Sequence, residues 1–315
     1  MRFATIQSPT GPEFVLGLKA GNYVRWKDYV NLFPNDKLIA QTRTLLDFVK
    51  VSRLLLDHVR KNFERLNSLP AIQVNPTDYA LPFTPVMFRD FYCFEEHVKN
   101  ARKGRGADML PEWYEAPIFY YSNHLSFRGP FEEIPFPQGS EEMDLELEIA
   151  AVVGRELRNA SLEEAREAIF GYTLVNDWTA RDFQRFEMKI NMGPTKGKDF
   201  ATSFGSFIIT PDELESKRSG KGYDLEFSAE IGGELLTKKN WKGIQFSFEE
   251  MLVRASKNCT VYPGEVIASG TMGLGCLMEH NIGKDQKRWL KKGETVTLRW
   301  LPDGPMISNR IGEPK

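Results

Sequence analysis

Hydrophobic and acidic residues alternate over residues 143–153, and the segment ends in the apolar run 150–153. This alternation predicts a β-strand, because successive side chains of a strand point to opposite faces. Glu146 and Glu148 share one face, and the apolar end indicates that the strand enters the core. Two carboxylates roughly 6 to 7 Å apart are close enough to share one cation. A half-buried strand that exposes its acids to water is the alternative, and it is the simpler explanation for an isolated pair.

The first 70 or so residues have a pattern of their own. Short strand-like pieces separated by glycines are followed, from about Thr42, by leucines and valines at helical spacing. We expect this helix to end at residues 67–70, where a proline follows. The pattern predicts a small N-terminal α+β domain over residues 1–72 and a larger domain over residues 73–315.

The larger domain is predicted to be rich in strands. A helix is expected from Asp90, which can cap it, to about Arg102. Two further helices begin with capping boxes at Ser161 and Ser247. The strand-like segments lie at residues 118–121, 169–175, 206–210, 223–231 and 295–301. The predicted fold class is therefore mainly β, of the α+β type.

Composition and charge exclude several classes of protein. The formal net charge is −2, so the sequence offers no basic surface for nucleic acid. No apolar run is long enough to span a membrane, and the N-terminus lacks the apolar stretch of a signal peptide. The three cysteines are scattered without zinc-type spacing, which favours reduced thiols. We expect a cytoplasmic protein that binds neither nucleic acid nor membranes.

Four acids stand at the ends or on the faces of apolar segments: Asp90, Glu146, Glu148 and Asp177. An all-carboxylate set suits a hard cation such as Mg²⁺, Ca²⁺ or Mn²⁺ better than zinc or copper, for which His and Cys would be expected. The sequence predicts a divalent metal site if these acids converge in the fold.

Two other patterns have ordinary explanations. Cys93 and His97 are four residues apart on the predicted helix and could form a nucleophile pair, but this spacing is common in helices. Residues 193–200 form a loop with glycine and lysine that lacks the spacing of a nucleotide-binding P-loop.

Five short motifs occur in one order between about residues 80 and 310. The patterns are D-x-Y-x-x-x-x-H, E-x-E, N-D-W-[ST]-A-R-D-x-Q, G-K-x-F and S-G-T, at residues 90–97, 146–148, 176–184, 197–200 and 269–271. Together they resemble the fumarylacetoacetate hydrolase (FAH) family. The resemblance implies a mixed β-sandwich roll, a homodimer, and a divalent cation, Mg²⁺ foremost, with the ligands Asp90, Glu146, Glu148 and Asp177.

The resemblance also implies a reaction. The family cleaves a carbon–carbon bond in a 1,3-diketo acid, such as fumarylacetoacetate or an acylpyruvate, with an enolate leaving group chelated by the ion. Fumarylacetoacetate belongs to aromatic amino-acid catabolism. His97 is the implied base that activates water, and Glu279 is the candidate that orients it. The other implied site residues bind substrate or line its pocket, with Arg181 and Lys198 also acting in catalysis: Tyr92, Tyr121, Arg181, Gln184, Lys198 and Thr271.

Other functions remain open at this point. The same scaffold could decarboxylate oxaloacetate, or act as a hydratase or isomerase on a 2-oxo acid. A non-catalytic protein that binds small acids is an alternative of a different class. A glycosidase that uses Glu146 and Glu148 is disfavoured, because neighbouring positions on one strand cannot flank a sugar bond. The chain is shorter than the tyrosine-degrading hydrolases, and we expect residues 122–140 to shape the distal end of the substrate pocket.

Overall fold

A long mixed sheet runs through the computed structural model, which describes residues 1–18 and 21–314. The strand order is β4-β3-β2-β1-β13-β10-β9-β18-β5-β6, and β12 and β7 extend from β10. The strands are β1 (Arg2–Ser8), β2 (Gly11–Gly17), β3 (Asn22–Arg25), β4 (Ile72–Gln73), β5 (Phe88–Phe91), β6 (Phe119–Tyr121), β7 (Phe127–Arg128), β9 (Leu147–Val153), β10 (Ile169–Asp177), β12 (Thr202–Phe204), β13 (Ile208–Ile209) and β18 (Val266–Ala268).

A second, antiparallel sheet packs against the first. Its order is β17-β16-β19-β20, with β16 (Glu226–Ile231), β17 (Glu234–Asn240), β19 (Thr295–Leu301) and β20 (Met306–Arg310). Gly232 and Gly233 join β16 to β17 with φ of +60° and +86°, the left-handed conformation that glycine adopts without strain. Two short pairs complete the strands: β8 (Met143–Asp144) with β11 (Thr179–Ala180), and β14 (Arg218–Ser219) with β15 (Gly222–Tyr223). The predicted mixed sandwich of the α+β type is confirmed.

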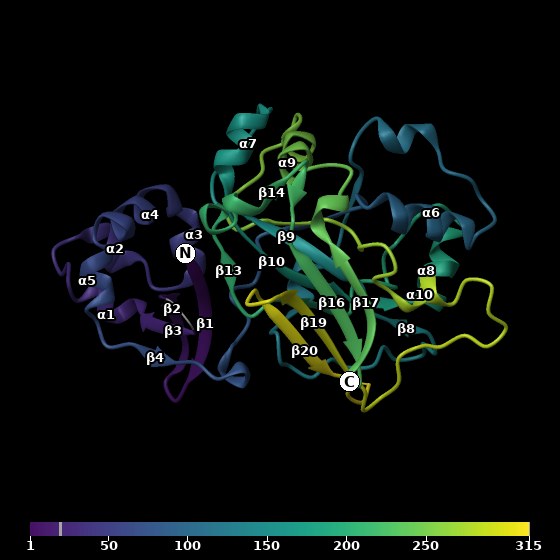
Figure 1. The fold of residues 1–315 in the computed structure, drawn as a ribbon, viewed down its shortest axis with the longest axis horizontal. Coiled ribbons are helices and arrows are strands. Elements are labelled where there is room, and N and C mark those ends of the chain that lie inside the picture. The colour runs from purple at the N-terminus through teal and green to yellow at the C-terminus, as the bar shows by residue number, and fades with distance from the viewer. Residues whose placement is uncertain (19–20, 315) are drawn as a thin grey trace.

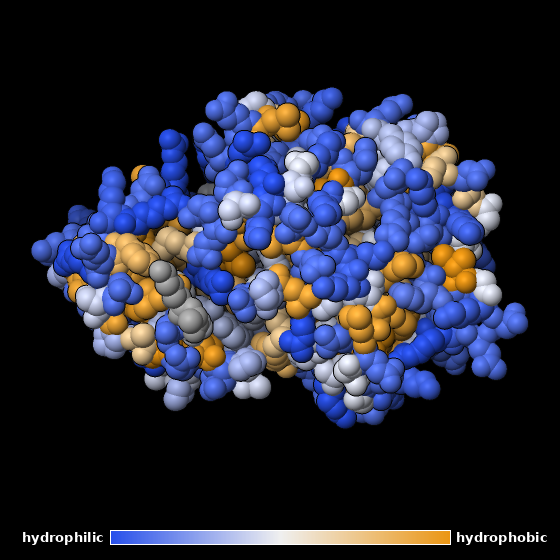
Figure 2. Space-filling view, viewed as in Figure 1, coloured by the Kyte–Doolittle hydropathy of each residue, from blue (hydrophilic) through white to orange (hydrophobic). Residues whose placement is uncertain are grey.

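The helices gather at the two ends of the molecule and above the sheets (Figure 1). The N-terminal group is α1 (Trp26–Val30), α2 (Lys37–Gln41), α3 (Leu45–Lys50), α4 (Ser52–Lys61) and α5 (Phe63–Asn67). At the other end lie α6 (Glu95–Lys103), α8 (Arg181–Met188) and α10 (Leu277–His280), and above the sheets lie α7 (Leu162–Ala168) and α9 (Phe248–Ser256). On the face drawn in Figure 2, apolar groups are scattered among hydrophilic ones.

Both faces of the central strand β9 are buried. Leu147 and Ile149 belong to the core between the two sheets, whereas Ala150 and Val152 pack into a second core beneath the N-terminal helices. Glu148, on the same face as Ala150, is also fully buried. The alternative of a half-buried strand that exposes its acids is wrong, because Glu148 lies against Thr271 and beside Asp90 and Glu146 instead of in water.

Residues 1–72 contribute to the long sheet as well as to the helices. β1 pairs antiparallel with β13, and β2, β3 and β4 continue the sheet outward. The division of the chain at residue 72 stays a prediction. The single long helix expected from Thr42 is wrong: a capping box at Thr44 starts α3, and the helical segment is interrupted at Val51 and Asn62.

Two predicted elements near the acids differ from the structure. The strand expected over residues 143–153 is divided into β8 and β9, because the amide of Glu146 donates to the Asn176 side chain instead of to a neighbouring strand. Asp90 does not cap a helix. It lies within β5, which pairs with β18 and β6, and α6 begins only at Glu95. The capping boxes at Ser161 and Ser247 are confirmed.

Among residues 1–18 and 21–314, no helix combines the length and the apolar character needed to cross a bilayer.

Candidate active site

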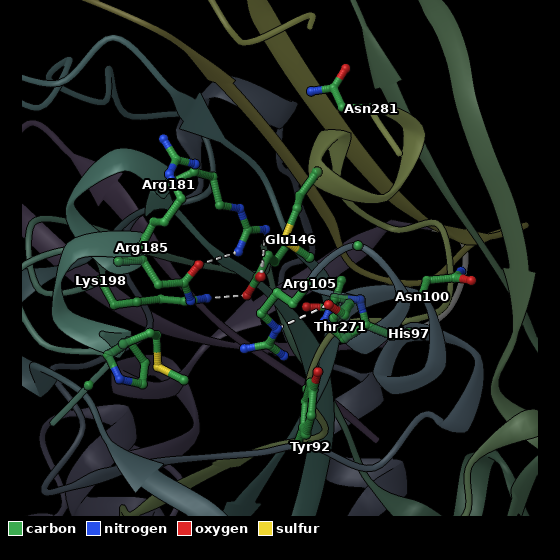
Figure 3. Close-up of a pocket in the computed structure, with 18 of the residues that line it drawn as sticks. Tyr92, His97, Asn100, Arg105, Glu146, Arg181, Arg185, Lys198, Thr271 and Asn281 are labelled. Carbon is green, nitrogen blue, oxygen red and sulfur yellow. Dashed lines mark hydrogen bonds and ion pairs between the residues drawn. The ribbon is translucent and has the colours of Figure 1, made fainter. Parts of the chain in front are cut away.

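A cavity of about 920 Å³ opens at the end of the molecule that carries α6, α8 and α10. Its floor contains acids and aromatic residues from β5, β6 and β9, and its walls come from the three helices and the loops that follow them. Nine of the predicted site residues and one more tyrosine line it: Asp90, Tyr92, His97, Tyr120, Glu146, Glu148, Arg181, Gln184, Lys198 and Thr271. Figure 3 shows Lys198 pointing toward Glu146, with His97, Thr271 and Tyr92 on the other side of that carboxylate.

Strand register brings the acids together. Asp90 on β5 lies beside Ala268 on β18, and Ala268 lies beside Ala150 on β9. Glu148 precedes Ala150 by two residues and therefore faces the same way. Asp177 ends the neighbouring strand β10. Segments that are far apart in the sequence thus place their carboxylates at one edge of a buried sheet surface.

The carboxylates form a set that suits a cation. One oxygen from each of Asp90, Glu146 and Glu148 lies within 4.8 Å of the others. Within the described residues, Oδ1 of Asp90 and Oε2 of Glu148 are buried and have no hydrogen-bond partner. Burial of such an oxygen is costly. Oxygen ligands of this kind fit a divalent cation, which would remove that cost.

The charge state of the three acids differs with their surroundings. Burial, together with the neighbouring Asp177, raises the pKa of Asp90 to about 8. Burial also raises the pKa of Glu148 well above its usual range. Burial opposes ionisation of Glu146 too, but Lys198 and Arg181 hold its pKa at about 2. Two of the acids therefore favour the protonated form unless a cation lies beside them.

Two buried cations hold Glu146 in place. Lys198 Nζ contacts Oε2 of Glu146 and lies 2.8 Å from Oδ2 of Asp177. Arg181 Nη2 lies 2.7 Å from Oε1 of Glu146, and its Nε lies 2.8 Å from Oδ2 of Asp144. Arg181 Nη1 also donates to Oε1 of Gln184 at 3.0 Å. Lys198 and Arg181, which were predicted to donate hydrogen bonds to the substrate, thus form ion pairs with acidic residues of the protein itself.

Tyr120 joins two of the acids, and the sequence analysis did not single it out. Its hydroxyl oxygen lies 2.5 Å from Oδ2 of Asp90 and 2.6 Å from Oδ2 of Asp177. A phenol has a single hydrogen to donate. The hydroxyl therefore bridges the two carboxyls, and burial raises the pKa of both Asp90 and Asp177.

Tyr121 does not line the cavity. The residue is 58% exposed and lies beyond the set of residues that form the walls. Tyr120 faces Asp90 across the strand pair β5–β6, and neighbouring strand residues point to opposite faces. The structure therefore places Tyr120, and not the predicted Tyr121, in the cavity.

His97 and Glu279 form a buried pair. Nδ1 of His97 lies 2.7 Å from Oε2 of Glu279. Asn100 and the amide of Leu274 donate to Oε1 of Glu279 at 2.8 and 2.9 Å, and the thiol of Cys276 donates to Oε2 at 3.3 Å. Burial would raise the pKa of Glu279, but His97 and these hydrogen bonds hold it at about 2. The cysteine that forms a cluster with His97 and Glu279 is Cys276.

The loop after β18 completes the inner wall. Thr271 Oγ1 donates to Oε1 of Glu148 at 3.3 Å. Gly270 has a φ of +76°, and a Cβ at this position would collide with the carbonyl oxygen of Phe91. The glycine is thus required by close packing on β5. The ring of Tyr92 packs edge to face with His97 at 5.4 Å, and burial raises the pKa of Tyr92 to about 12.

The outer part of the cavity is basic and apolar. Its apolar wall includes Ile118, Met188, Ile282 and Trp289. Its cations are Lys103, Arg105, Arg185, Lys189, Lys284 and Lys287, and among the described residues only Arg185 of these six has an ion-pair partner, Glu142. The expectation that residues 122–140 shape this end was wrong, because the segments around α6, α8 and α10 occupy it.

Comparison with known proteins agrees with the fold. The model of the fumarylacetoacetate (FAA) hydrolase C-terminal family matches residues 86–312, and the chain belongs to this family. It is 27% identical to a fumarylacetoacetase of Oryza sativa, over 76% of this chain and 69% of that protein. It is 25% identical to the mitochondrial oxaloacetate tautomerase FAHD2B of Bos taurus, over 99% of this chain and 91% of that protein. The fold is also similar to the solved structure of maleylpyruvate hydrolase from Sphingobium sp. SYK-6 in complex with manganese(II) and pyruvate. The superposition covers 100% of this chain and 100% of that chain, with a TM-score of 0.69 and 16% sequence identity.

Proposed function

We propose that this protein is a metal-dependent hydrolase that cleaves a carbon–carbon bond in a 1,3-diketo acid of the acylpyruvate or fumarylacetoacetate type. The observation that carries the proposal is the His97–Glu279 pair beside a set of buried carboxylates with unsatisfied oxygens. The fumarylacetoacetases among the relatives support this reaction class.

Asp90, Glu146 and Glu148 would hold the divalent cation, and Asp177 would complete the acidic set. Mg²⁺ is the ion we expect, with Mn²⁺ or Ca²⁺ as alternatives, because oxygen ligands suit all three. The manganese and pyruvate named with the Sphingobium structure are consistent with a cation that binds a 2-oxo acid. When bound, the cation supplies Lewis-acid polarisation of carbonyl oxygens.

His97 would act as the general base. Glu279 accepts the hydrogen bond from Nδ1, which fixes the tautomer and leaves Nε2 to take a proton from water. The hydroxide part of that water adds to the acyl carbon, the bond to the neighbouring methylene carbon breaks, and His97 returns the proton to that carbon. The products are a carboxylic acid and pyruvate or its analogue. Glu279 stabilises the imidazolium between the two proton transfers.

Other residues of the chain would bind the substrate. Lys198, Arg181 and Gln184 border Glu146 and could donate to substrate oxygens once the cation takes over part of the carboxylate charge. Tyr92 and Thr271 form the inner wall. The basic rim attracts anions, which supports a negatively charged substrate with an apolar portion.

A second candidate is tautomerisation of oxaloacetate. The similarity to the Bos taurus tautomerase extends over nearly the whole of this chain, whereas the similarity to the Oryza fumarylacetoacetase covers about three quarters of it. Tautomerisation needs proton transfer at the carbon next to a carbonyl group, without attack by water. Decarboxylation of oxaloacetate, hydratase or isomerase chemistry on a 2-oxo acid, and a homodimeric assembly stay predictions.

The two candidates are separated by their products. With an acylpyruvate and Mg²⁺, the hydrolase proposal predicts pyruvate and a carboxylic acid in equal amounts, measured by chromatography. With oxaloacetate prepared as its enol, a tautomerase would accelerate loss of the enol absorbance without loss of carbon. Conversion of the enol together with no cleavage of any acylpyruvate would replace the hydrolase proposal with the tautomerase.

A further inference from the structure

His97, Cys276 and Glu279 form a second cluster of metal-ligating groups, buried beside the cavity. One atom from each, the imidazole nitrogen, the sulfur and a carboxylate oxygen, lies within 4.8 Å of the others. The cluster joins two segments, because His97 belongs to α6 whereas Cys276 and Glu279 belong to the start of α10. The proposed reaction uses the His–Glu pair, but it gives no role to the thiol.

We propose that these three residues bind a borderline or soft divalent ion such as Zn²⁺ or Co²⁺, at a site separate from the carboxylate set. Thiolate and imidazole ligands select such ions, whereas carboxylates alone favour Mg²⁺ and Mn²⁺. A thiolate and a carboxylate together carry two negative charges, which balance the charge of the ion in a buried place. The chain thus holds two adjacent ligand sets of different chemical hardness.

The geometry is close to what tetrahedral zinc needs. Zinc bonds of about 2.0 to 2.3 Å place neighbouring ligand atoms about 3.4 to 3.6 Å apart. Oε2 of Glu279 lies 2.7 Å from Nδ1 of His97 and 3.3 Å from Sγ of Cys276. Each of these two separations must therefore open by less than about 1 Å. Of the three residues only His97 is among those that line the cavity, so an ion would enter past this side chain.

Binding at this site would change the protons of the cluster. The thiol of Cys276 loses its proton to solvent, and the imidazole proton moves from Nδ1 to Nε2 because the ion takes Nδ1. A protonated Nε2 cannot accept a proton from water. Zn²⁺ would therefore inhibit the enzyme even when Mg²⁺ saturates the carboxylate set; this consequence rests on the proposed function, whereas the metal site itself does not.

The direct test measures a metal–sulfur bond and not turnover. Cys259, which is exposed, is first changed to Ser so that it cannot bind the probe. The protein is stripped with chelator, supplied with excess Mg²⁺, and titrated with Co²⁺ while the near-ultraviolet charge-transfer band of cobalt thiolate is recorded. We expect the band to saturate at one Co²⁺ per chain. We also expect it to disappear when Zn²⁺ is added, because Zn²⁺ displaces Co²⁺ from the same ligands.

The matched variant adds Cys276→Ser, which keeps a hydrogen-bond donor near Glu279. The band should disappear, and the affinity for Zn²⁺ should fall at least about tenfold, as loss of a metal-site partner does elsewhere. If that variant does not fold, judged by circular dichroism, Glu279→Gln in the same Cys259→Ser background keeps the thiol and should weaken Co²⁺ binding by a similar factor. The absence of a thiolate band, or a band that survives Cys276→Ser, would overturn the proposal.

Discussion

Nδ1 of His97 lies 2.7 Å from Oε2 of Glu279, although the two residues are 182 positions apart in the chain. Both side chains are buried, and Asn100 and the Leu274 amide hold the other oxygen of Glu279. A carboxylate held on both oxygens can fix the orientation and the tautomer of its imidazole partner. The pair therefore has the arrangement that a general base requires.

His97→Ala should lower kcat for acylpyruvate cleavage by about 10²- to 10⁴-fold, the usual contribution of a general base. Glu279→Gln should lower it less, because the base remains but loses its orienting charge. The double variant should be about as slow as His97→Ala alone, since the two residues act as a unit. Steady-state kinetics on the three proteins tests this. Turnover that survives His97→Ala would rule out hydrolysis by this base.

Glu279 should make the stability of the protein depend on pH in the acid range. Its pKa of about 2 in the folded protein is below the ordinary value of 4.5, so the ionised form stabilises the fold. The stabilisation, about 3 kcal/mol at most, is present above pH 4.5 and is lost as the pH falls toward 2. Denaturant unfolding of the wild type and Glu279→Gln should show a difference in the free energy of unfolding that shrinks from pH 6 to pH 3. A difference that stays constant would contradict the assignment.

Lys198→Met should destabilise the protein in the absence of divalent ions. The substitution removes the buried ammonium from Glu146, which keeps Arg181, and from Asp177, whose ion-pair partner it is, at a cost of about 3 kcal/mol. Saturating Mg²⁺ should recover part of the loss, because the cation supplies charge to the same acids. Lys196→Met is the control: that side chain is 74% exposed, and its loss should not change the unfolding curve. Equal effects of the two variants would contradict the role given to Lys198.

Tyr120→Phe and Tyr121→Phe form a matched pair on neighbouring residues. The Tyr120 hydroxyl contacts Asp90 and Asp177, so its removal should weaken binding of the divalent cation by about 10- to 100-fold. Tyr121 is exposed, and its hydroxyl should be dispensable. Isothermal titration with Mn²⁺ measures both affinities. A larger loss in Tyr121→Phe would mean that the strand register around Asp90 is different.

The sequence predicted the parts of the fold that depend on local pattern. Residues 161–164 and 247–250 formed the expected capping boxes, and the alternating residues of β19 formed a strand with the predicted bounds. The errors lie where a distant segment decides the outcome. Asp90 looked like a helix cap because the sequence does not show that β18 and β6 pair on either side of it.

In the candidate site, too, the residues in local motifs were predicted, and those placed by contacts between distant segments were missed. Asp90, Glu146, Glu148 and His97 were named from the sequence, and the structure brings them to one cavity, whereas Asp177 lies next to it as the partner of Lys198. Tyr120 was missed because Phe119, Tyr120 and Tyr121 are consecutive aromatics, and only the register with β5 determines which of them faces the acids. Cys276 was missed because its contact with Glu279 depends on how the chain turns before α10.

The most direct test of the central claim is turnover of a small panel of acylpyruvates, followed by loss of their ultraviolet absorbance. The wild-type protein is assayed with Mg²⁺, again after removal of the ion by chelation, and once more after Mg²⁺ is restored. We predict cleavage that stops when the ion is removed and returns when it is added back, with pyruvate among the products. If no acylpyruvate is consumed under any of the three conditions, or if cleavage continues unchanged after chelation, the proposed metal-dependent hydrolase is wrong.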